Sequence, residues 1–220
     1  ASQRKLKRTG RVPQGPAPGD ALMETSWLHT APATEPIALD ETKRHLRIED
    51  AVTEDDALIV TDIEAVRQWA ETFPGRALIS QTWDLKLDGF PSGRIVLPRP
   101  PVTAVTFIQY IDTAGTTQTL SSSLYRVELP TGPLAAPAHI EPSYGETWPS
   151  TQSVSNAVTV RYVCGYGTKG VQVPANIRKA MLLRLGTLYE QREGMVVGTI
   201  ASPIPRADEE TMLWPFKVWR

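Results

Sequence analysis

Proline restricts the fold of this chain more than any other residue type, because its ring fixes φ and removes the backbone amide donor. The 220 residues include 19 prolines. Most of them gather in four stretches, at residues 13–36, 91–101, 130–149 and 203–215. Helix interiors and central strands exclude such stretches. We therefore expect compact helices and strands between them, joined by stiff, extended connectors.

The composition is typical of a soluble globular protein, with 41% hydrophobic and 21% charged residues. The length suits one well-packed domain or two small ones. A net charge of −1 means that the chain as a whole does not attract DNA, so any contact with DNA must come from a local patch. No apolar run approaches the roughly 20 residues that span a bilayer, and no apolar stretch follows the basic start as in a secretory signal. We expect no membrane contact.

Residues 1–36 are predicted to be an extended, Pro-rich arm, because they bury too little apolar surface to offset the entropy of ordering. The first eleven positions hold five basic side chains and no acidic one. The basic residues are Arg4, Lys5, Lys7, Arg8 and Arg11. Such an arm contacts either DNA phosphates or an acidic protein surface. Its first twenty positions lack aromatic residues, which argues against base stacking.

Two helices are predicted before residue 75. The first covers residues 39–48, with Asp40 and Glu41 in the first turn, where they oppose the helix dipole. The second follows residues 53–56, which resemble a capping box, and ends at residues 73–75. Its apolar face carries Ile59, Ile63, Val66 and Ala70. Its outward face is predicted to carry Glu54, Asp55, Asp62, Glu64 and Glu71. An acidic face of this kind is usually only solvated.

Residues 75–173 are predicted to form an antiparallel β module. From Ala77 the hydrophobic period changes to two, which places alternate side chains from Ile79 to Leu87 on one buried face. A short return strand is predicted at Arg94–Leu97, after a turn. Further strands are predicted at residues 102–112, 117–120, 125–129, 138–141 and 157–164. No crossover helices separate these strands, so we expect antiparallel pairing.

A third helix is predicted from Pro174 to Gly194, because proline suits the first helical turn and glycine the helix end. The predicted fold class is α+β, with a small helical bundle formed by the N-terminal helices and a C-terminal helix, an inserted antiparallel β module, and extended terminal arms. The bundle takes residues 37–74 and 174–194, the β module residues 75–173, and the two arms residues 1–36 and 195–220.

No motif predicts a catalytic residue, a metal site or a bound cofactor. Residues 165–170 have the glycine spacing of a dinucleotide site, but Pro174 starts the helix too late and no parallel strand follows. A tight strand-to-helix turn with φ > 0 explains the same glycines. Cys164 is interpreted as a buried strand residue. The three histidines have neither the spacing of a metal site nor a diagnostic spacing to Cys164.

The C-terminal tail carries the strongest candidate binding feature. Trp214, Phe216 and Trp219 lie within six residues and are interrupted by Pro215. The segment is too short to form a core and too apolar to favour water, and aromatic residues with arginine typically anchor interfaces. We favour docking in a partner's groove over the alternative, in which the tail packs back on the β module.

Four stretches of this sequence carry a family resemblance. They are TEPIALDETKRHLR at 34–47, GRALISQTW at 75–83 with DGFP at 88–91, YVCGYG at 162–167 leading to LYEQRE at 188–193, and LWPF at 213–216. In this order and spacing they resemble the head-tail connector, or adaptor, family of tailed phages and gene transfer agents. Together they span roughly residues 34–216.

The resemblance implies a structural virion protein rather than an enzyme. Such proteins form a ring, usually of twelve subunits, beneath the portal protein and above a stopper or tail-end protein, at the head-tail junction called the neck. DNA passes through the ring without sequence-specific binding. The tail is similar to segments that dock on the portal, which implies this role for Leu213, Trp214, Pro215 and Phe216. Trp219 lies beyond the family-like stretch and is a docking candidate as an aromatic residue of the same tail, so whether it joins the contact stays open. The acidic face of the second helix becomes the candidate channel lining, since like charges repel DNA.

Two features depart from the family pattern. Ala38 stands where the family has a serine or threonine helix cap, which predicts a frayed first turn at a cost of about 1 kcal/mol. The basic arm before residue 34 is not part of the pattern, so the resemblance implies nothing about its role. Two alternatives stay open: a stopper or tail-completion protein of the neck, and, from another class, a glycan-binding β module or an enzyme.

Overall fold

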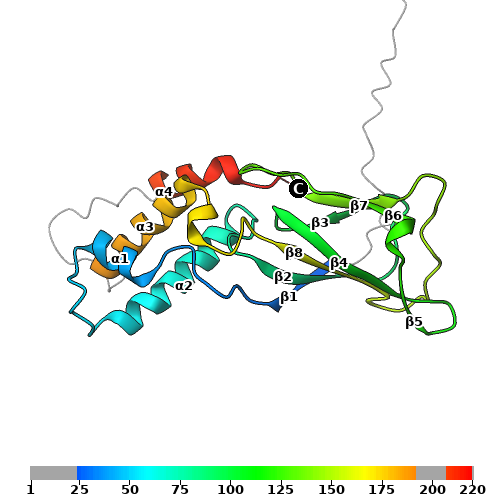
Figure 1. Cartoon of the computed structure of the whole chain (residues 1–220), viewed down its shortest axis with the longest axis horizontal. Coiled ribbons are helices and arrows are strands. Elements are labelled where there is room, and N and C mark those ends of the chain that lie inside the picture. The colour runs from blue at the N-terminus through cyan, green and yellow to red at the C-terminus, as the bar shows by residue number, and fades with distance from the viewer. Residues whose placement is uncertain (1–23, 192–206, 220) are drawn as a thin grey trace, which may run out of the picture.

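The structure is a computed structural model that describes residues 24–191 and 207–219. Within these residues, four α-helices gather at one end of the molecule and two antiparallel β-sheets at the other (Figure 1). The helices come from both sides of the β region in the chain. The predicted α+β class is therefore confirmed.

The helical end is organised around one hydrophobic core. Its helices are α1 (Leu39–Leu46), α2 (Asp56–Thr72), α3 (Ala175–Glu190) and α4 (Ala207–Leu213). The core also takes Leu78 and Ile79, from the segment that leads into the β module. Its most buried members from the helices and the approach to α1 are Ile37, Ile59, Ile63, Val66, Ala70, Ile177, Ala180, Met181, Leu185 and Leu213. The apolar face predicted for the second helix is thus the buried one.

The starts of the first two helices lack side-chain caps. α1 begins after Ala38, which makes no capping hydrogen bond. α2 begins after Asp55, also without a cap, so the capping box predicted at residues 53–56 is wrong. The carboxylate of Asp56 instead forms an ion pair with the buried Lys43 of α1 at 3.0 Å. This ion pair holds the start of α2 against α1.

The C-terminal part of the chain differs most from its prediction. α3 begins at Ala175, one residue after the predicted start at Pro174, and ends at Glu190; the predicted end at Gly194 lies outside the described residues. α4 and the 3₁₀ turn Trp214–Phe216 replace a tail predicted to be irregular. Leu213 and Phe216 are only 0% and 6% exposed, because they fill the core of the helical end. These two residues are therefore wrong as direct docking residues.

The β end contains, within the described residues, a five-stranded and a three-stranded sheet in which every pair is antiparallel. The first has the order β1 (Glu24–Thr30), β2 (Gln81–Leu87), β8 (Val158–Cys164), β4 (Val102–Ile111) and β5 (Thr117–Thr119). The second has the order β3 (Ile95–Leu97), β7 (Ala138–Pro142) and β6 (Tyr125–Glu128). Residues from both sheets form a second core, among them Leu85, Leu97, Ile108, Ile140 and Val160.

β2 shows the predicted alternation, with its odd-numbered residues from Gln81 to Leu87 buried. Ile79, predicted on the same face, precedes the strand and lies in the core of the helical end. The prediction that β3 returns beside β2 is wrong, because β3 pairs with β7 in the second sheet. β2 pairs instead with β8, where Trp83 lies opposite Tyr162.

β1 corrects the extent of the predicted N-terminal arm. Its residues pair with β2 from Glu24 opposite Leu87 to Thr30 opposite Thr82. The arm predicted over residues 1–36 is therefore wrong for this segment, which is an ordered edge strand with mostly exposed side chains. The basic residues Arg4, Lys5, Lys7, Arg8 and Arg11 lie outside the described residues.

The helical and β ends are joined at Glu71, in the last turn of α2. One carboxylate oxygen accepts hydrogen bonds from the amide of Leu78 at 3.0 Å and from Nε2 of Gln81 at 2.7 Å. The other oxygen pairs with Arg67 at 3.3 Å. The placement of Glu71 on an outward acidic face is wrong, because the segment after α2 covers it and leaves it 6% exposed.

The polar network around Glu71 extends in two directions. Arg67 donates from Nε to Glu35, which precedes α1, at 2.8 Å. Burial raises the pKa of Glu35, because the loss of solvent outweighs the hydrogen bond and the charge of Arg67. On the other side, the indole of Trp83 donates to Oε1 of Gln81 at 3.0 Å. One chain of polar contacts therefore connects the approach to α1, α2 and β2.

We predict that Glu71→Ala lowers the free energy of unfolding by about 3 kcal/mol, because Arg67 and the amide of Leu78 lose a buried partner. Urea denaturation followed by circular dichroism measures the change. The matched control is Glu64→Ala on the same helix, whose side chain is 58% exposed, and it should change stability by less than about 0.5 kcal/mol. Equal effects of the two substitutions would contradict the assigned role of Glu71.

We predict that Phe216→Ala also destabilises the chain by about 3 kcal/mol, since it leaves a cavity in the core of the helical end. Trp214→Ala, two residues earlier, removes a side chain that is 52% exposed and should cost no more than about 1 kcal/mol. The same denaturation experiment compares them. A larger loss for Trp214→Ala would show that the buried and exposed sides of the tail have been assigned the wrong way round.

Candidate docking surface

The C-terminal tail is held against the turn between α2 and β2. Nε of Arg76 donates to the carbonyl of Phe216 at 2.5 Å, and the amide of Val218 donates to the carbonyl of Pro74 at 2.8 Å. Gly75, between the two turn residues, has φ 73°, a conformation that favours glycine. These contacts give the residues after α4 a defined path.

Two tryptophans lie on the surface of this anchored tail. Trp214 and Trp219 are 52% and 69% exposed, and their rings form a T-shaped pair with centroids 5.6 Å apart. The ammonium group of Lys217 lies 4.8 and 5.1 Å from the two centroids, within range of cation–π attraction. Phe73 extends the group, 6.3 Å from Trp214. We call these four residues the tail aromatic cluster. Exposed aromatic rings of this kind are typical of interface anchors.

The five predicted docking residues therefore divide into two sets. Trp214, Pro215 and Trp219 are exposed, whereas Leu213 and Phe216 lie in the core. The exposed set stays a prediction for partner contact. The buried set positions it from inside the chain.

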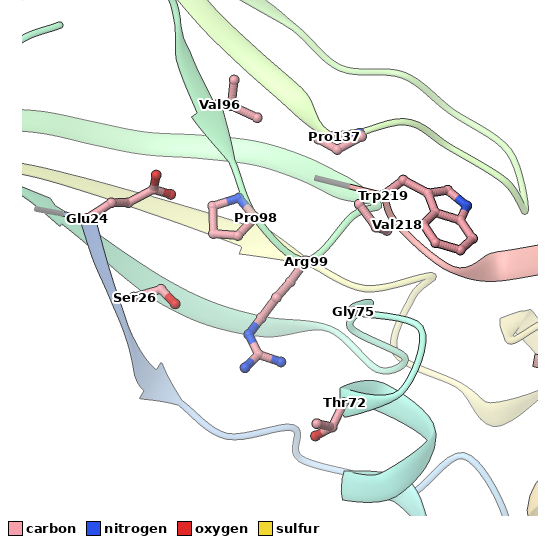
Figure 2. Close-up of a pocket in the computed structure, with 10 residues that line it drawn as sticks. All are labelled: Glu24, Ser26, Thr72, Gly75, Val96, Pro98, Arg99, Pro137, Val218 and Trp219. Atoms are coloured by element: carbon pink, nitrogen blue, oxygen red, sulfur yellow. The ribbon is translucent and has the colours of Figure 1, made fainter. Parts of the chain in front are cut away.

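A pocket of about 420 Å³ lies beside the tail aromatic cluster and shares Trp219 with it (Figure 2). Its other walls come from β1, from the end of α2 and from the segment that follows β3. Figure 2 shows Arg99 reaching into the pocket. Its guanidinium carbon lies 4.0 Å from the ring centroid of Trp83. Arg99 belongs to the predicted Pro-rich connector at residues 91–101, but the sequence did not indicate it as a site residue.

The predicted acidic face of α2 is not continuous. Its exposed members are Glu54 and Glu64, and its half-buried members are Asp55 and Asp62. Asp55 accepts a hydrogen bond from the hydroxyl of Tyr189 at 2.9 Å. Leu58 and Val60 are 41% and 50% exposed on the same helix. Together with the burial of Glu71, this makes the surface of α2 a mixed one, with two exposed carboxylates among the five predicted.

The glycine motif after β8 forms the predicted tight turn. Gly165 and Gly167 have φ values of 127° and 149°. A Cβ on Gly165 would lie 2.5 Å from the carbonyl carbon of Ile79, so the close approach of the backbone requires glycine. Cys164 is fully buried as predicted, and burial raises the pKa of its thiol, which keeps it protonated.

No group of three or more His, Cys, Asp or Glu side chains in residues 24–191 and 207–219 is placed to hold a metal ion. Among the helices described here, none is both long and apolar enough to cross a membrane.

Solved structures share this fold over most of the chain. A chain in the neck of an empty gene transfer agent particle, computed with C6 symmetry, matches with a TM-score of 0.73 and 22% identity, over 89% of this chain and 96% of that chain. A chain in the virion of the native particle matches with a TM-score of 0.70 and 23% identity, over the same shares. A chain in the native neck computed with C12 symmetry matches with a TM-score of 0.65 and 21% identity, over 87% and 96%.

The sequence itself matches a family model over residues 36–123, and the family is described as phage gp6-like head-tail connector proteins. A search of curated proteins finds no match. The matched region runs from the approach to α1, through α2 and the Glu71 network, to the turn after β5. It includes all but the first two residues of the stretch at 34–47 and the whole of those at 75–83 and 88–91 that carry the resemblance. The family match over residues 36–123 and the shared fold of the solved neck chains thus bear out the resemblance to the phage head-tail connector family.

Proposed function

We propose that the chain is the adaptor subunit of a neck, at the head-tail junction of a virion, where it forms a ring of twelve subunits. The match of residues 36–123 to head-tail connector proteins carries this proposal. The similar folds occur in particles whose necks were computed with C6 and C12 symmetry, which supports a ring with this subunit number. Identical head-to-tail contacts close into a ring when the rotation per subunit divides a full turn.

The ring joins the portal protein on one side to a stopper or tail-end protein on the other. The tail aromatic cluster is the proposed portal contact, with Trp214, Pro215 and Trp219 as the contacting residues. Its support is the combination of exposure and anchoring described above. Aromatic side chains that are already ordered lose little entropy on binding, so more of the contact energy appears as affinity.

DNA passes through the ring without sequence-specific binding in this proposal. Glu54 and Glu64 are the candidate channel-lining residues, with Asp55 and Asp62 behind them. Carboxylates on the lumen wall release no counterions from DNA, so DNA does not bind to the wall during ejection.

The basic side chains of the N-terminal arm are proposed to contact an acidic partner surface or DNA at the rim. Deletion of residues 1–22 should then weaken the complex in a salt-dependent way.

We predict that the double substitution Trp214→Ala and Trp219→Ala weakens binding to isolated portal rings by at least about tenfold, because it removes the exposed anchors. Electron micrographs of portal rings mixed with the protein, together with sedimentation, measure the bound fraction. Tyr144→Ala is the control, since it removes a fully exposed aromatic residue from the loop after β7, and it should bind normally.

The experiment also separates the neck proteins from one another. Wild-type protein that never joins a portal ring, at any concentration, would contradict the adaptor proposal. Cross-links to tail components in the absence of any to the portal would favour the alternative, a stopper or tail-completion protein.

A further inference from the structure

The pocket in Figure 2 lies between an edge strand of the five-stranded sheet and an edge strand of the three-stranded sheet. β1 is the edge of the five-stranded sheet, and β3 is the edge of the three-stranded sheet. Both strands line the pocket, through Glu24 and Ser26 of β1 and Val96 of β3. In the part of the chain that the structure describes, neither strand has a second neighbour. Each edge therefore leaves backbone amide and carbonyl groups without a sheet partner, and such edges accept an added strand.

The side chain of Arg99 is held in this pocket. Its guanidinium carbon lies 4.0 Å from the ring centroid of Trp83, which is almost fully buried. Its backbone has φ 61°, between Pro98 and Pro100, in a region that non-glycine residues rarely adopt. Strained residues of this kind cluster at binding sites.

Among residues 24–191 and 207–219, Arg99 forms no ion pair with a carboxylate, and its guanidinium packs against the ring of Trp83. The carboxylate of Glu24, which also lines the pocket, extends toward Pro98 in Figure 2 and lies apart from the guanidinium of Arg99. Much of the remaining wall is apolar, from Val96, Pro137 and Val218. A planar guanidinium in such surroundings favours a carboxylate, which it binds through two parallel hydrogen bonds.

We propose that this pocket binds an extended segment of the portal protein and that a carboxylate side chain of the segment pairs with Arg99. The extended form follows from the two open edges, and the carboxylate follows from a guanidinium that has no carboxylate partner among the described residues. The inference rests on the proposed adaptor function, because the pocket shares Trp219 with the tail aromatic cluster, so a partner docked there covers both.

The charge of the chain's own N-terminal residues argues against them as the occupant of this pocket. Residues 1–23 lead directly into β1, but they carry five basic side chains and one acidic side chain, Asp20. Their charge is of the same sign as that of Arg99. Charge complementarity therefore favours a segment from another protein.

The test uses fluorescently labelled, overlapping short peptides that cover the portal protein of the same virus, with peptides of this chain in parallel. We expect an acidic portal peptide to bind the full-length wild-type chain. Arg99→Gln should weaken this binding by about tenfold, as should replacement of the peptide's carboxylate by an amide. The two changes together should weaken binding no further than either alone, because both remove the same pair.

Two further variants keep the result interpretable. Arg94→Gln removes an exposed arginine that precedes β3 and does not line the pocket, and it should leave binding unchanged. Arg99→Lys keeps the charge but loses the planar fork, so its affinity should lie between those of the wild type and Arg99→Gln. Thermal unfolding of each variant confirms that it is folded before binding is compared.

The inference is overturned if no portal peptide binds, if binding ignores both Arg99→Gln and the amide peptide, or if a peptide of this chain binds instead. Binding of the intact wild-type chain to portal rings is measured separately. Intact portal binding without peptide binding rejects the pocket assignment and leaves the adaptor proposal standing. If the intact wild-type chain does not bind portal rings, the adaptor proposal itself is rejected.

Discussion

The carboxylate of Glu71 accepts the amide of Leu78 and the side-chain amide of Gln81 while it pairs with Arg67. A carboxylate this deeply buried is costly unless donors satisfy its lone pairs. Here the donors come both from the helix that carries it and from the segment that covers it. Because α2 and β2 follow each other in the chain, the network fixes the orientation of the β end relative to the helical end. We call this network around Glu71 the joint, and the tail and the pocket both contact residues next to it.

The C-terminal tail returns to the same joint from the far end of the chain. Arg76, in the segment just after Glu71, donates to the carbonyls of Phe216 at 2.5 Å and Ala135 at 2.8 Å. One buried side chain thereby ties the tail to the turn after α2 and to the loop before β7. The exposed faces of Trp214 and Trp219 consequently have a position set by the joint. This differs from an interface segment that is ordered only on binding, which must lose its conformational entropy at that moment.

Local sequence patterns were sufficient to predict the helices and strands and their buried faces, but not which segments pair or pack with one another. The alternation around Trp83 and the four-three-four spacing on α2 depend on neighbouring residues, and both predictions match the buried faces. The pairing of β3 with β7, the strand at residues 24–30 and the burial of Glu71 depend on segments that meet only in the folded chain. For the same reason the sequence indicates an aromatic tail without separating Phe216 from Trp214. Arg99 carries no local signal, since its setting depends on a ring 16 positions earlier that packs beneath it.

Trp83 connects the joint to the pocket. Its indole nitrogen donates to Gln81, which in turn donates to Glu71, while its ring lies beneath the guanidinium of Arg99. A shift of β2 relative to α2 would therefore move Trp83 and, with it, the charge that the pocket offers. The helical end and the pocket are therefore connected through the side chains of Glu71, Gln81, Trp83 and Arg99. If the helical end makes the contacts that close a ring, each subunit presents Arg99 and the tail aromatic cluster at the same orientation to the ring. A symmetric partner needs this repetition, because every copy must then meet an equivalent site.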